Sequence, residues 1–159
     1  MSDTWDGFVD AVREESRLLR ELKESARALT DALVKNTLPL MDRAQRQLEA
    51  SRLRHEAALN ARMAMQRRGF GTMALREVCS YAPPEVAAAL QSSIADMTYS
   101  AIGIGITNNN NKALVHAGFQ RLDRTVKVLQ NARSDKVGVY KRRGNIPRGN
   151  ASVLVSQRA

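Results

Sequence analysis

The residues that could carry out chemistry are few in this sequence, and they lie far apart. It contains one cysteine, Cys79, and two histidines, His55 and His116. A cysteine nucleophile needs a histidine base and a third group that orients the base, and no motif here supplies such a set. Zinc-binding sequences show spacings such as CxxC, HxxxH or HExxH, and none occurs. We therefore expect no enzymatic activity, no catalytic residue, no metal site and no cofactor.

Composition and the N-terminal residues indicate a helical protein of the cytoplasm. The chain has 159 residues, of which only 4% are aromatic, and its size fits one domain. A single cysteine excludes an internal disulfide framework and fits a reducing compartment. The acidic N-terminus lacks the order of a signal peptide. The weakly charged run from Val86 to Ile106 includes several polar residues, so it predicts a buried helix face rather than an integral membrane segment.

Apolar residues at alternating steps of three and four predict long amphipathic helices. The first runs from about residue 4 to 36 and the second from about 38 to 67, separated at Asn36-Thr37 before Pro39. A kink at Pro39 in one long rod is the alternative. A short helix at about 72–79 and a long one at about 85–130 follow two glycine and proline breaks. These elements predict an all-α fold, an elongated antiparallel three-helix bundle or coiled-coil-like hairpin over residues 1–131, with a flexible basic tail at 132–159.

The third long helix contains an unusual run of four asparagines, Asn108 to Asn111. The heptad series Ile94, Ala101, Asn108, Val115, Leu122, Leu129 passes through this run, and a second series that includes Asn111 lies beside it. Because the phase is kept, we expect a continuous helix, although asparagine is a poor helix former. The alternative is a break with an exposed asparagine loop. Asn108 and Asn111 would then form a polar layer that fixes helix register.

Positive charge is concentrated at the C-terminal end. Residues 133–158 contain seven basic residues and one acidic residue, a net charge of 7 − 1 = +6. Such an arm suits nucleic acid, an acidic protein surface or anionic lipid, or only improves solubility. Arginines of the second helix could add phosphate contacts, but Asp42, Glu49 and Glu56 interrupt them, so nucleic-acid binding is the less favoured interpretation.

The order of these segments resembles the FlgN family of flagellar type III export chaperones. In that family two long helices, a glycine and a short helix precede a long helix with an asparagine-rich step and a tail in which a tyrosine and a glycine lie close together. The corresponding segments here are the Phe8–Leu33 repeat, the Leu38–Arg68 helix, Met73–Cys79, Asn108–Leu114 and Tyr140–Gly144. Lys141 stands where the family tail usually has a glycine.

The resemblance implies a cytoplasmic chaperone that binds hook–filament junction proteins, prevents their premature assembly and delivers them to the type III export gate. It places client binding in the C-terminal third and export-gate docking at Tyr140. Those residues of the client site that lie in the long helix could instead belong to the core of a helical bundle. A generic coiled-coil adaptor and a basic nucleic-acid-binding protein remain alternative functions, and the client-free protein could form a homodimer. The expected client-binding residues are Leu122, Val126, Leu129, Val153, Leu154 and Val155.

Overall fold

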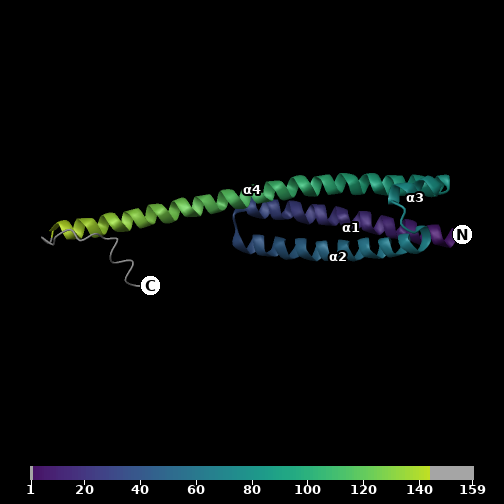
Figure 1. Cartoon of the computed structure of the whole chain (residues 1–159). Helices are drawn as coiled ribbons and strands as arrows, with labels where there is room; N and C mark the ends of the chain where they lie inside the picture. Colours follow the sequence, from purple (N-terminus) through teal and green to yellow (C-terminus); the bar gives the residue numbers. More distant parts are fainter. Residues whose placement is uncertain (1, 144–159) are drawn as a thin grey trace. The chain divides into compact units, whose positions relative to one another are not determined.

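The computed structural model describes the backbone of residues 2–143 and the side chains of residues 5–133. Every regular element in this range is a helix, and no strand occurs among these residues, which confirms the predicted all-α class. The chain divides into two compact units, Met1–Val115 and His116–Ala159. The helices are α1 (Ser2–Lys35), α2 (Leu38–Phe70), α3 (Leu75–Tyr81) and α4 (Pro84–Arg143), shown in Figure 1.

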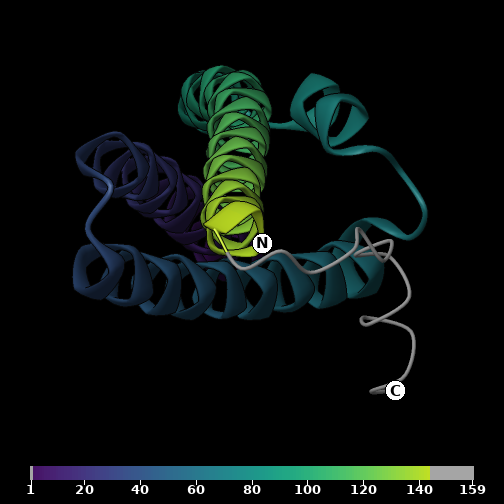
Figure 2. The ribbon, with the colours of Figure 1, turned by 90° about the vertical axis from the view of Figure 1, so that its left-hand side faces the viewer.

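The connection between α1 and α2 is a break and not a kink. Asn36 adopts a left-handed backbone conformation with φ of 51°, which asparagine tolerates better than most residues. Pro39 lies in the first turn of α2, where its missing N–H costs no helical hydrogen bond. The chain therefore reverses direction over a very short segment, and α1 and α2 lie side by side (Figures 1 and 2).

Polar contacts show that α1 and α2 are antiparallel. Toward the middle of α1, Glu15 pairs with Arg62 of α2, and their closest atoms are 2.6 Å apart. Further along α1, the hydroxyl groups of Ser25 and Ser51 lie 2.8 Å apart. Later positions in α1 thus meet earlier positions in α2.

The first part of α4, up to Val115, runs parallel to α1. Arg20 of α1 pairs with Asp96 at 3.2 Å, and the Thr30 hydroxyl donates a hydrogen bond of 2.7 Å to the Asn111 side-chain oxygen. Later positions in α1 here meet later positions in α4. Within the first unit α1 therefore contacts both α2 and α4.

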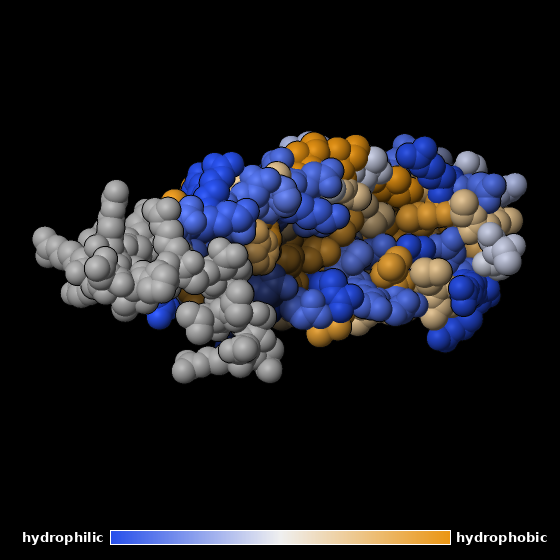
Figure 3. Space-filling model, turned by 60° about the vertical axis from the view of Figure 1, so that its left-hand side comes forward, coloured by the Kyte–Doolittle hydropathy of each residue, from blue (hydrophilic) through white to orange (hydrophobic). Residues whose placement is uncertain are grey.

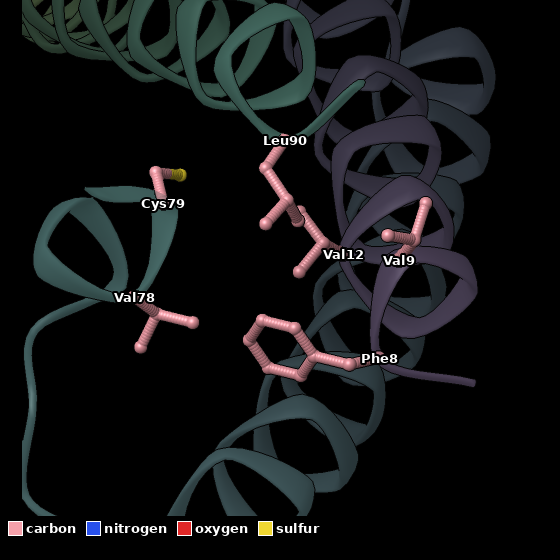
Figure 4. Close-up of a cluster of buried hydrophobic side chains, with 6 residues drawn as sticks. All are labelled: Phe8, Val9, Val12, Val78, Cys79 and Leu90. Carbon is pink, nitrogen blue, oxygen red and sulfur yellow. The ribbon is translucent and has the colours of Figure 1, made fainter. Parts of the chain in front are cut away.

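An apolar cluster holds α1, α3 and α4 together within the first unit. Phe8 and Val12 of α1, Val78 of α3 and Leu90 of α4 point toward a common space (Figure 4). The Phe70 ring at the end of α2 covers Phe8, with centroids 5.0 Å apart. Each fully buried aliphatic side chain contributes about 1.5–3 kcal/mol, so this cluster is a major source of stability. Its buried members are Phe8, Val9, Val12, Val78, Cys79 and Leu90.

Helix α4 continues through the asparagine run, as predicted, but it does not end where expected. The sequence placed its end near Gln130, and α4 instead ends at Arg143. Gly138 is the only glycine between Asn131 and Arg143, and one glycine costs a helix only about 1 kcal/mol relative to alanine. The first proline beyond this segment is Pro147. The remaining residues of the predicted tail, 144–159, lie outside the described part of the chain.

Candidate partner-binding surface

The chemically reactive side chains of Cys79, His55 and His116 differ in burial. Cys79 is buried in the apolar cluster, and this burial raises the pKa of its thiol. His55 belongs to the first unit, whereas His116 belongs to the second and lies 3.0 Å from the Gln120 amide nitrogen. No group of three or more potential metal ligands exists among the residues that the structure describes.

The arginines of α2 are largely occupied by carboxylates. Arg52 pairs with Glu49 at 2.8 Å and with Glu56 at 3.3 Å, and its hydrogen bonds lower the pKa of Glu49. Arg46 pairs with Asp42 at 2.7 Å. These are the acidic residues that interrupt the basic series in the sequence, and each lies within one helical turn of the arginine that it pairs with.

The second unit carries a row of exposed apolar side chains, which we call the α4 stripe. Its members are spaced by three and four residues and therefore share one face of the helix. They remain exposed by 48–67%, although phenylalanine, leucine and valine are among the residue types most often buried. Within the second unit, no described residue covers them. The α4 stripe consists of Phe119, Leu122, Val126 and Leu129.

This exposure bears on the two roles that the sequence left open, bundle core and client binding. Leu122, Val126 and Leu129 could have been core residues of a bundle, but none of the three is buried. They are available to a partner, as a binding role requires. Phe119 completes the row and was absent from the predicted site, although its place beside the heptad series was visible in the sequence.

Polar residues border the α4 stripe on the same helix. Lys127 pairs with Asp123 at 2.7 Å, one helical turn away. Arg121, Arg124 and Arg133 are exposed. Charged residues thus interrupt the apolar surface, and alternating hydrophobic and hydrophilic areas are also seen on the face drawn in Figure 3.

The two predicted register residues occupy different environments. Asn111 is buried, with 7% of its surface exposed, and it also donates a hydrogen bond of 3.3 Å to the Ala26 carbonyl oxygen. Asn108 is exposed. The inward face of α4 follows the series that includes Asn111, and Ala101 and Val115 of the other series are exposed. Of the two asparagines, Asn111 is therefore the one whose hydrogen bonds join α4 to α1.

The side chains of the other predicted residues lie outside the described part of the chain. Tyr140 lies within α4, beyond the last described side chain. Val153, Leu154 and Val155 lie outside the described residues.

A cleft of about 590 Å³ beside α3 and α4 was not predicted. Arg76 and Cys79 line it from α3, and Ile94, Tyr99 and Ile102 line it from α4. The apolar residues of α4 repeat with helical spacing, but that pattern does not say which of them an adjoining helix leaves uncovered.

Comparisons with known proteins identify no relative: no protein-family model matches the chain, and neither a curated protein nor a solved structure matches it. Along residues 2–143, no helix combines the length and apolarity needed to cross a membrane.

Proposed function

We propose that this protein is a cytoplasmic export chaperone of the bacterial flagellum that binds hook–filament junction proteins and delivers them to the type III export gate. The observation that carries the proposal is the α4 stripe, in which four large apolar side chains remain uncovered. An amphipathic helix of a client can bury such a row by helix-in-groove packing. The flagellar assignment rests on the resemblance of the segment order to the FlgN family.

In this proposal residues 2–115 form an antiparallel three-helix bundle that acts as a scaffold. The described contacts within the unit include the buried Glu15–Arg62 pair and the apolar cluster. A rigid scaffold keeps the first half of α4 ordered, so the binding half loses less conformational entropy when a client docks. The chaperone acts by binding and not by catalysis.

Co-expression with the junction proteins of the same organism tests the proposal. We expect a one-to-one complex with at least one of them, detected by size-exclusion chromatography with light scattering. A truncated protein that ends at Arg143 tests whether Val153, Leu154 and Val155 belong to the client site. We expect this truncated protein to bind the junction protein more weakly than the full-length chain does. If neither form binds any junction protein, the chaperone proposal is wrong.

Tyr140 has a separate proposed role in docking at the export gate. Tyr140→Phe and Tyr140→Ala variants should retain the client complex because client binding is assigned to other residues. Export of the junction protein in motile cells should fall with the alanine variant and fall less with the phenylalanine variant. Loss of the client complex itself would place Tyr140 in the client site instead.

A generic coiled-coil adaptor is the second candidate, since the α4 stripe would serve it equally well. An adaptor would bind a partner unrelated to the flagellum with its helices alone, and residues 144–159 would be dispensable. Retention on DNA that falls steeply with added salt would instead indicate nucleic-acid binding.

A further inference from the structure

The series of positions that forms the α4 stripe changes from apolar to basic residues at its C-terminal end. Continuing the same spacing beyond Leu129 leads to Arg133 and then to Lys136. Arg133 is exposed, and both positions lie within helix α4. The series is therefore apolar over Phe119–Leu129, and basic residue types occupy its next two positions along α4. We call Arg133 and Lys136 the cationic end.

The wider charge of this helix argues against a second copy of the chain as the occupant. Residues 116–143 contain eight basic and two acidic residues, a net charge of 8 − 2 = +6. Two copies of this segment packed along each other would repel, whereas an acidic partner would be attracted.

The width of the α4 stripe favours a single helix over a membrane surface. Helices that lie in a membrane interface bury a broad apolar face. Here the row is narrow, because the charged pair Asp123–Lys127 lies within the same turns. A narrow row with three- and four-residue spacing is the form that a pairwise helix seam takes.

We propose that the occupant of this surface is a partner helix whose own apolar row ends in acidic residues that face Arg133 and Lys136. This inference rests on the proposed function and specifies the class of helix that is recognised. The apolar row supplies burial, while the cationic end fixes the register and direction of the bound helix, as polar positions do in coiled coils.

Two synthetic helical peptides of identical composition test this directly with the full-length chain. Both carry leucine at the positions of one apolar row, and two glutamates replace either the first two or the last two of these leucines. We expect fluorescence anisotropy to show that one peptide binds about tenfold more tightly, and the preferred peptide reports the direction of docking. Equal affinity for the two peptides would overturn the inference.

Charge reversal supplies the matched control. Arg133→Glu with Lys136→Glu should abolish or invert the preference between the peptides. Arg121→Glu with Arg124→Glu changes the net charge equally, but these residues lie off the stripe, so the preference should persist. Circular dichroism checks that both variants remain helical. A preference that survives the first pair of changes, or disappears with the second, contradicts the role of the cationic end.

Other occupants give distinct results. Tighter binding to vesicles of anionic phospholipid than to either peptide would overturn the inference in favour of a membrane. A dimer that Leu122→Asp dissociates in sedimentation would overturn it in favour of a second copy. If the junction-protein complex forms but neither peptide binds, this inference fails and the proposed function stands. Absence of the junction-protein complex would remove the proposed function itself.

Discussion

Leu90 and Leu122 lie on the same helix, yet one is fully buried and the other is 63% exposed. Leu90 belongs to the first unit, where Val12 of α1 and Val78 of α3 complete its surroundings. Leu122 belongs to the second unit, where no described residue supplies such a partner. The comparison teaches that apolar spacing defines a face, whereas only a neighbouring element makes that face a core. The proposed function takes the α4 stripe as a face whose neighbour is another molecule.

Replacing each of the two leucines by alanine should give the largest difference in the free energy of unfolding. Leu90→Ala creates a cavity in the apolar cluster and should lower the free energy of unfolding by about 2–5 kcal/mol. Leu122→Ala removes an exposed side chain and should change it by no more than about 0.5 kcal/mol. Urea denaturation followed by circular dichroism measures both. A comparable loss for Leu122→Ala would mean that the stripe is already covered within the protein.

Ion pairs allow a similar comparison between buried and exposed sites. The side chains of Glu15 and Arg62 are only 6% and 12% exposed, so Glu15→Ala leaves a buried guanidinium without its carboxylate. We expect a loss of about 3 kcal/mol in the free energy of unfolding. Glu49→Ala breaks an exposed pair with Arg52, and its effect should be much smaller. Equal effects in urea denaturation would contradict the buried position of the first pair.

The asparagine run provides a third pair of variants. Asn111→Ala removes hydrogen bonds to Thr30 and to the Ala26 carbonyl and should cost about 1 kcal/mol. Asn108→Ala changes an exposed residue to a better helix former and should stabilise the protein by about 0.5 kcal/mol. Thermal unfolding of the two variants should therefore shift in opposite directions. The same direction for both would remove the distinction between the two asparagines.

Replacing each of two glycines of α4 by alanine should give the smallest difference in stability. At Gly105 an added methyl group meets nothing within 4 Å, so Gly105→Ala should stabilise the helix by about 1 kcal/mol. At Gly103 the same methyl group would lie 3.0 Å from Cδ of Lys23, which must move. Lys23 also holds its ammonium 4.6 Å from the centre of the Tyr99 ring. We expect Gly103→Ala to gain less than Gly105→Ala in thermal unfolding, and a larger gain would show that Lys23 is free to move.

Local rules predicted those parts of the fold that depend on few neighbours. The break at Asn36–Pro39 follows from backbone preferences, and the continuity of α4 through Asn108–Asn111 follows from an unbroken apolar phase. The end of α4 was placed too early because the segment after Asn131 lacks a helical apolar period and contains three glycines and a proline, of which only Gly138 lies before Arg143.

Features that depend on tertiary contacts were less accessible from the sequence. The heptad pattern placed Asn108 and Asn111 on one seam, but only the contact with Thr30 shows which of them faces α1. The cleft at Tyr99 depends on where the short helix α3 packs. The sequence selected Leu122, Val126 and Leu129 as candidates, but it could not tell an exposed row from a core, since that depends on the absence of a neighbour.

The central claim is that the α4 stripe is the surface that binds the client. The most direct test measures, by isothermal titration calorimetry, the affinity of Leu122→Asp and Val128→Asp variants for the junction protein. Val128 is 65% exposed on the same helix but lies outside the stripe, so it controls for a new charge on an apolar position. We predict that Leu122→Asp weakens binding at least about a hundredfold, roughly 2.7 kcal/mol, while Val128→Asp binds as the unmodified protein does. Equal binding by the two variants would contradict the account.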